Sequence, residues 1–204
     1  MGHVKISPGN AKLGSIPSVS LPSVLTCAPG PCQHKCYARK LERLRPTVAA
    51  AYAGNLELLQ TDPVTFWREV EGAVMMSRFF RFHVSGDIPD KDYLRHMVEI
   101  AQKNQHCQIL CFTKKFELVN SYIFENALFG GRYPENLHII FSAWVGQQMI
   151  NPYLFPEAHI RYKDGSATTT LPCRECAGNC TQCAITDDGC WVLKPGERVI
   201  FNEH

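Results

Sequence analysis

The ten cysteines are the residues of this sequence best suited to do chemistry. They fall into three groups along the chain: Cys27, Cys32 and Cys36; Cys107 and Cys111; and Cys173, Cys176, Cys180, Cys183 and Cys190. Thiolates are soft ligands that select zinc, copper(I) or iron–sulfur clusters. A chain of 204 residues can bury an adequate core without disulfides. The grouped thiols therefore indicate metal or redox chemistry.

The first group lies in a loop rich in proline and glycine, CAPGPCQHKC. Its three thiols fall within ten residues and can converge on one centre. No fourth cysteine is near in sequence, which leaves two alternatives. One is a four-iron cluster with an open iron, and the other is a zinc ion completed by His34.

The third group has the pattern C-x2-C-x3-C-x2-C-x6-C. Two C-x2-C pairs at this density predict a metal site, because zinc and [4Fe–4S] clusters both take four thiolates. The pairs of zinc ribbons are usually ~15–20 residues apart, whereas three residues separate these pairs. The compact spacing favours an iron–sulfur cluster over zinc. Five cysteines for four positions leave one spare, and the sequence does not say which.

The elements that must position these groups alternate between strands and helices. Strands are expected at 78–87, 106–114 and 136–146, with shorter ones at 158–163 and 198–203. Apolar periodicity predicts helices that begin near residues 36, 47, 62, 89 and 115. Right-handed crossovers then give a mostly parallel sheet, so we expect an α/β fold with an open or partial β/α barrel. Residues 1–164 would form this domain, and residues 165–204 a Cys-rich, loop-rich tail that ends in a short strand.

Ligands of open parallel sheets bind at the carboxyl ends of the strands. The sequence places polar residues at three such ends: Ser85, Gly86 and Asp87; Thr113 and Lys114; and Ser142 and Trp144. The alternative for Asp87 is that it only turns or caps the chain, and for Lys114 that it is a solvated charge. Cys107 and Cys111 share one face of a predicted strand and are expected in the core.

Several segments carry a family resemblance: GNAKLGSIPSVSLPSVLTCAPGPCQHKCYARK, VSGDIPDKDYL, CFTKKFELVN, SAW and the C-terminal C-x-x-C…C-W. In this order and spacing they resemble a phage-encoded family named after gene product eighty-eight, from Gly9 to His204. A wider, weaker similarity is to the radical S-adenosylmethionine superfamily. That similarity implies that Cys27, Cys32 and Cys36 hold a [4Fe–4S] cluster whose open iron chelates S-adenosylmethionine. It also implies that the polar strand ends bind S-adenosylmethionine. The spacing here is x4 and x3 where that superfamily has x3 and x2, so a cluster without radical chemistry is the alternative.

Composition narrows the function classes further. A formal charge of +2 gives no strong case for nucleic-acid binding. The sequence has no apolar run long enough to cross a membrane and no signal-peptide pattern, so we expect an intracellular protein, in the host cytoplasm if it is phage-encoded. The leading hypothesis is an iron–sulfur protein with two [4Fe–4S] sites. If it is an enzyme, S-adenosylmethionine is the co-substrate and the substrate is a nucleic acid, a nucleotide or a peptide.

Two further hypotheses remain open at this point. One is a non-catalytic electron-transfer or redox-sensing iron–sulfur protein. The other is a binding module stabilised by zinc, which would unfold when the metal is chelated. A monomer and a homodimer are both compatible with the sequence.

Overall fold

A seven-stranded sheet in which every strand pair is parallel forms the centre of the molecule. The computed structural model describes residues 2–203. The strand order is β1-β2-β3-β4-β5-β7-β6. The strands are β1 (Ser18–Val19), β2 (Phe79–Phe82), β3 (Gln108–Thr113), β4 (Leu137–Ser142), β5 (Glu157–Arg161), β6 (Arg174–Glu175) and β7 (Arg198–Asn202). The sheet is open at both edges, which confirms the predicted α/β class and excludes a closed barrel.

The helices lie mainly between the strands, as the periodicity predicts. They are α1 (Ser23–Thr26), α2 (Tyr37–Leu44), α3 (Pro46–Thr61), α4 (Pro63–Met75), α5 (Lys91–Lys103), α6 (Phe116–Leu128) and α7 (Cys180–Ile185), with short 3-10 turns η1 (Pro31–Lys35) and η2 (Gly189–Trp191). Asp62 caps α4 by accepting a hydrogen bond from the Thr65 amide at 3.0 Å. Asp90 caps α5 in the same way through the Tyr93 amide at 2.8 Å.

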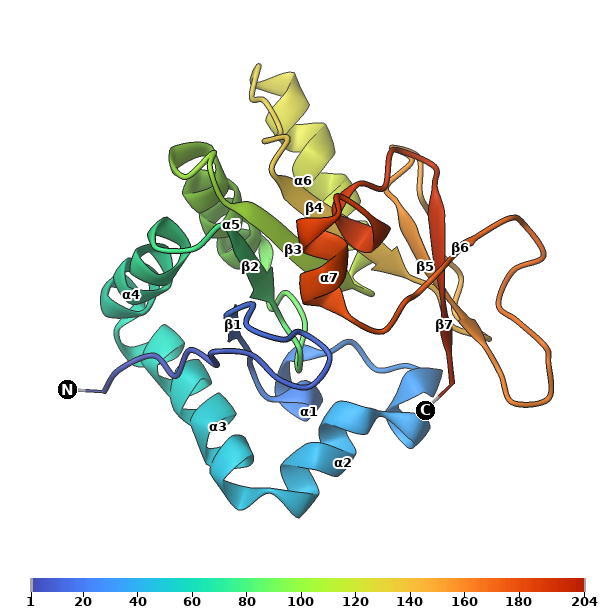
Figure 1. Ribbon diagram of the computed structural model, residues 1–204. Coiled ribbons are helices and arrows are strands. Elements are labelled where there is room, and N and C mark those ends of the chain that lie inside the picture. Colours follow the sequence, from blue (N-terminus) through green and yellow to red (C-terminus); the bar gives the residue numbers. More distant parts are fainter. Residues whose placement is uncertain (1, 204) are drawn as a thin grey trace.

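The two faces of the sheet are covered by different parts of the chain. The face that we call outer packs against α4, α5 and α6 through strand residues such as Phe82 and Phe141. Cys107 and Cys111 are fully buried in this outer core, as expected. Leu110 and Val199 lie on the opposite, inner face, where they pack against Trp191 of the Cys-rich tail. In Figure 1, α7 lies across the strands on the side away from α4 and α5.

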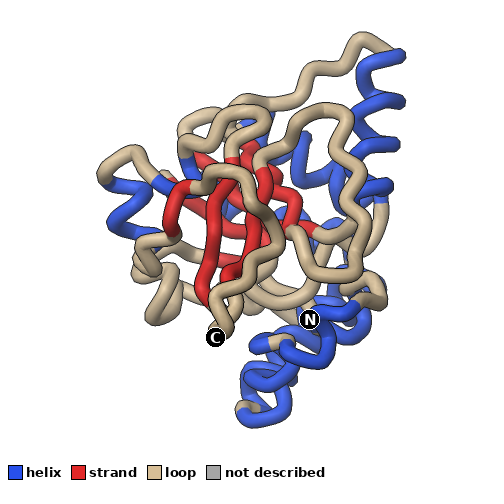
Figure 2. The backbone as a smooth tube through the Cα atoms, turned by 90° about the vertical axis from the view of Figure 1, so that its right-hand side faces the viewer, coloured by secondary structure: helices blue, strands red, loops and turns tan. Residues whose placement is uncertain are grey.

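The Cys-rich tail is continuous with the sheet. It supplies β6 and β7, and β7 pairs with β5 along the whole of both strands. The predicted C-terminal strand is thereby confirmed. Figure 2 shows the strands side by side, with long loop segments passing in front of them. Within residues 2–203, no helix combines the length and the apolar character needed to cross a membrane.

Candidate metal centres

The first cysteine group lies in the loop after β1, at the carboxyl edge of the sheet. Cys27 follows α1, Cys32 lies in η1, and Cys36 precedes α2. The Cys36 thiol caps α2 by accepting a hydrogen bond from the Arg39 amide at 3.5 Å. All three thiols are partly exposed. The loop therefore presents three thiols on one short stretch of chain beside the strand ends.

The charges around these thiols are set by two residues at the strand ends. The pKa of Cys27 is raised to about 12, first by burial and then by Asp87; Lys114 opposes the increase, and Cys36 and Cys32 make smaller contributions to it. Burial also raises the pKa of Cys32, and Lys114 again opposes the increase. The three thiols are therefore electrostatic neighbours. Any metal that they bind must displace protons, because only thiolates are good ligands.

Asp87 is occupied by donors from the protein. It is 4% exposed, and its Oδ1 accepts hydrogen bonds from Thr113 Oγ1 at 2.6 Å and the Ile88 amide at 2.8 Å. Its Oδ2 accepts from the Lys114 amide at 2.9 Å, and Lys114 Nζ donates to Ser142 Oγ at 3.1 Å. These bonds tie the end of β2 to the end of β3. The contacts of Asp87 are thus those of a structural residue, as the alternative prediction has it.

Ser85 and Gly86 connect the same strand end to the cysteine loop. Ser85 Oγ donates to Glu42 of α2 at 2.6 Å, and the same carboxylate accepts from the Ser23 amide at 3.1 Å. Gly86 has a φ of +83°, and a Cβ there would lie 2.7 Å from the Leu21 carbonyl oxygen. Glycine is therefore required where this strand end approaches the loop.

A pocket of about 280 Å³ opens beside the three-thiol loop at this edge. It is lined by residues of the loop, of the start of α6 and of the segment after β4: Ala28, Lys114, Lys115, Phe116, Glu117, Leu118, Gln147, Gln148 and Ile150. Trp144 is not among them; its ring meets that of Tyr162 edge-on, with 6.4 Å between centroids. Of the strand-end residues expected to bind a cofactor, Lys114 is the one that lines this pocket.

Four cysteines of the third group line a second pocket, on the inner face of the sheet. Cys176 follows β6, Cys180 and Cys183 lie in α7, and Cys190 lies in η2. The pocket encloses about 20 Å³, and its other walls are mainly apolar: Leu110, Phe112, Trp191, Val199 and Phe201. We call this cavity the four-thiol pocket, after the four cysteines that line it. The tail thus brings four thiols to one place although they are spread over fifteen residues.

Burial favours the protonated form of three of these thiols. Burial, together with the neighbouring thiols of Cys176 and Cys180, raises the pKa of Cys190 to about 12. Burial also raises the pKa of Cys180, where Arg81 and Lys12 oppose the increase. The pKa of Cys183 is likewise raised, first by burial and then by Cys180 and Asp188.

Cys173 lies apart from the other four. Its Sγ contacts the Leu171 carbonyl oxygen at 3.4 Å. Burial raises its pKa, and the charges that act on it are those of Arg198, Glu175, Glu157 and Arg161. None of these residues lines the four-thiol pocket. The structure therefore separates the five cysteines into a set of four, spaced C-x3-C-x2-C-x6-C, and a lone Cys173.

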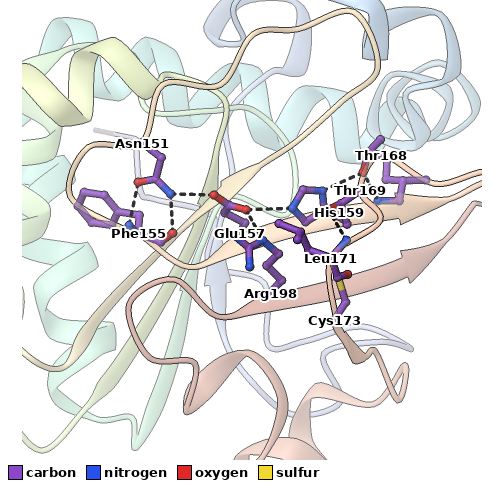
Figure 3. A network of polar contacts seen from close by, with 10 residues as sticks. Asn151, Phe155, Glu157, His159, Thr168, Thr169, Leu171, Cys173 and Arg198 are labelled. Atoms are coloured by element: carbon purple, nitrogen blue, oxygen red, sulfur yellow. Dashed lines mark hydrogen bonds and ion pairs between the residues drawn. The ribbon is translucent and has the colours of Figure 1, made fainter.

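The surroundings of Cys173 contain a polar network that sequence reasoning missed (Figure 3). Glu157 Oε2 accepts from Arg198 Nε at 2.8 Å and lies 3.1 Å from His159 Nε2. His159 Nδ1 is 3.0 Å from Thr168 Oγ1. The signal in the sequence is Glu157 and His159 two residues apart on one strand, which places both on one face. The network holds the loop after β5 against the sheet.

No three side chains of His, Cys, Asp or Glu within residues 2–203 are arranged so that they could hold a metal ion. His34, the proposed alternative ligand of the first group, is exposed. For either thiol group to hold a metal, its cysteine side chains must therefore move from the positions that the structure gives them.

Fold and thiols together define an open, parallel α/β protein with one cysteine group at the carboxyl edge of its sheet and another on the inner face. Comparison with known families refines this class. A model of the family described as Gene product 88 matches residues 4–184. The chain belongs to this family. The matched range contains the three-thiol loop and Cys183, and it ends before Cys190, so the resemblance expected up to His204 is confirmed only as far as residue 184.

Two curated relatives are the Gene 88 proteins of Mycobacterium phage L5 and Mycobacterium phage D29. Each is 29% identical in an alignment of 150 positions, and the alignment covers 66% of this chain and 60% of the relative. The chain thus spans less than two thirds of the length of these relatives. No solved structure matches the chain. None of these matches supports the similarity to radical S-adenosylmethionine proteins, which stays a prediction.

Proposed function

We propose that this protein binds metal through thiolates at two sites and that both sites hold iron–sulfur clusters. The observation that supports this most strongly is the four-thiol pocket. One apolar pocket is lined by four cysteines from three separate short segments: Cys176, Cys180, Cys183 and Cys190. The fifth cysteine of the group, Cys173, lies elsewhere. A [4Fe–4S] cluster takes four thiolates, and apolar walls shield it from water.

The size of the four-thiol pocket points to a second candidate for the metal that it holds. About 20 Å³ accommodates roughly one water-sized sphere. A four-iron cluster is larger than this volume, so α7 and η2 would have to move away from the sheet to admit it, whereas a single zinc ion needs less space. A structural zinc site of four cysteines is therefore the second candidate, and the small volume of the pocket is the observation that favours it.

The three-thiol loop is suited to an open site. It offers three thiolates and no fourth cysteine, and it stands at the carboxyl edge of a parallel sheet, where ligands of such sheets bind. Lys114 supplies positive charge beside Cys27 and Cys32. We propose that a cluster here leaves one iron free for S-adenosylmethionine, which would supply radical chemistry when bound.

The polar strand ends limit how that co-substrate could be held. The side chains of Ser85, Thr113 and Asp87 are bonded to protein partners, and Ser142 is bonded to Lys114. Of the polar strand-end residues, Lys114 also lines the 280 Å³ pocket, next to Lys115, and we propose this pocket as the place where a ligand is contacted. If S-adenosylmethionine does not bind there, the protein is an electron-transfer or redox-sensing protein. The proposed setting is the host cytoplasm, with a nucleic acid, a nucleotide or a peptide as substrate.

Metal analysis tests this proposal directly. The protein is purified without oxygen, and iron, acid-labile sulfide and zinc are assayed together with an absorption spectrum. About eight irons and eight sulfides per chain would support two clusters, and about four would support one. Zinc alone would establish the second candidate, and a protein free of all three would overturn both. A change in the cluster spectrum on adding S-adenosylmethionine to the reduced protein would support an open iron.

A further inference from the structure

Two cationic side chains, Arg81 of β2 and Lys12 of the N-terminal loop, line the four-thiol pocket. The Arg81 guanidinium carbon lies 4.8 Å from the ring centre of Phe112, and Lys12 Nζ lies 4.5 Å from that of Phe201. Both rings belong to the same pocket. Cation–π contacts of this kind hold the two charges over the inner face of the sheet.

The hydrogen-bonding capacity of the Arg81 side chain is not fully used in this structure. Its Nε is buried and has no hydrogen-bond partner, which costs free energy unless something compensates for it. Among residues 2–203, no carboxylate forms an ion pair with Arg81 or Lys12, whereas Asp188 near Cys183 is paired with Arg174. The pocket therefore holds two positive charges without negative partners.

With a metal bound, the four thiolates of the pocket would supply the missing negative charge. Four thiolates around a divalent ion carry two excess negative charges, and a four-thiolate [4Fe–4S] cluster in its oxidised state carries the same. A buried charge is tolerated where an opposite charge compensates for it. Arg81 and Lys12 provide the matching two positive charges on the sheet side of the pocket.

We propose that Arg81, assisted by Lys12, is the counter-charge of a metal–thiolate centre formed by Cys176, Cys180, Cys183 and Cys190. This inference rests on the proposed function and names a residue that tunes the site without ligating the metal. Removal of the Arg81 charge weakens metal binding. In an iron–sulfur centre it also lowers the reduction potential, since reduction adds a further negative charge.

Cobalt(II) titration of the metal-free, full-length chain tests the inference, since the thiolate-to-cobalt absorption reports on ligation. The signal of the four-thiol pocket is the part that Cys190→Ser abolishes. We expect Arg81→Gln to weaken this binding on the order of tenfold, and Arg81→Lys to restore most of it. Arg78→Gln is the matched control, because Arg78 directly precedes β2, lies over the ring of Phe79 and does not line the pocket.

The outcomes separate the inference from the proposed function. Equal affinity of Arg81→Gln and the unsubstituted chain, or equal loss in Arg81→Gln and Arg78→Gln, would overturn the counter-charge. Failure of Arg81→Lys to restore binding would also overturn it, because the role would then be steric. Absence of any cobalt signal in the unsubstituted chain would overturn the proposed function itself. Thermal unfolding of each metal-free variant confirms that it is folded.

Discussion

Individual thiols in this protein are strongly affected by burial. Cys107, which lies in the outer core away from both proposed sites, has its pKa raised by burial to about 12, whereas a thiol in an unfolded chain titrates near ~8.5. The folded state therefore holds this proton more tightly than the unfolded state. The corresponding stability is fully present below about pH 8.5 and is lost as the pH rises toward the folded-state pKa.

We expect the free energy of unfolding to fall as the pH is raised from about 8 to about 10. Part of this decline should disappear in Cys107→Ala, whose side chain cannot ionise. Urea unfolding at a series of pH values, with reductant present, measures both slopes. Identical slopes in the two proteins would show that Cys107 does not contribute.

The side chain of Asp87 holds the end of β2 and the end of β3 together through hydrogen bonds. Replacement by Asn removes the charge and leaves at least one of the Thr113, Ile88 and Lys114 donors without an acceptor. We expect Asp87→Asn to cost about 2 kcal/mol of stability. Asp164→Asn is a suitable control, because Asp164 bonds Ser166 in an exposed turn, and it should change stability by less than ~0.5 kcal/mol. Equal effects of the two changes in urea unfolding would contradict the structural role of Asp87.

The sequence predicted the cysteine groups, but it did not predict which four members of the third group lie together. Cys173 and Cys176 stand on either side of the two-residue strand β6. Pairing of β6 with β7 fixes where the chain leaves the sheet, so Cys176 enters the pocket and Cys173 does not. Spacing alone does not carry that information, because it depends on contacts with a strand more than twenty residues later.

At the scale of elements, the attachment of α7 to the N-terminal loop decides whether the four thiols stay together. The Cys180 amide donates to the Lys12 carbonyl oxygen at 2.9 Å, and Thr181 Oγ1 donates to that of Leu13 at 2.7 Å. Gly14 has a φ of +62°, and a Cβ there would lie 2.2 Å from Thr181 Oγ1. These contacts join two segments that are far apart in the sequence.

Gly14→Ala should therefore displace α7. We expect a loss of stability of more than ~1 kcal/mol and a loss of metal from the four-thiol pocket. Gly54→Ala is the matched control, because a Cβ at that position in α3 meets nothing within 4 Å. That change should stabilise the helix by up to ~1 kcal/mol. Metal content and thermal unfolding of both variants check this, and normal metal content in folded Gly14→Ala would contradict it.

The elements that the sequence predicted are those with a periodic pattern. Helices α4, α5 and α6 and strands β2, β3 and β4 lie where apolar periodicity placed them. Strands β1 and β6 have two residues each, which is too short to show any period. Their positions depend on tertiary pairing with β2 and β7, so local sequence could not predict them.

At the scale of the whole molecule, helices cover one face of the sheet and the cysteine tail covers the other. All four thiols of the four-thiol pocket belong to the tail. A metal bound there would therefore cross-link segments of the tail and hold the tail against the inner face. Removal of the metal should loosen residues 165–190 while β7 stays paired with β5. We expect a chelator to accelerate proteolysis within residues 165–190 and to leave the helices intact. Cleavage that begins in α5 or α6 would contradict this arrangement.

The central claim is that four particular thiols form one metal centre, and a matched pair of single substitutions tests it most directly. Cys173→Ser and Cys190→Ser are purified without oxygen beside the unsubstituted chain, and iron, sulfide and zinc are measured in all three. We expect Cys173→Ser to keep the full metal content and Cys190→Ser to lose the share of one site. Equal metal content in the two variants, or a loss in Cys173→Ser alone, would contradict the account.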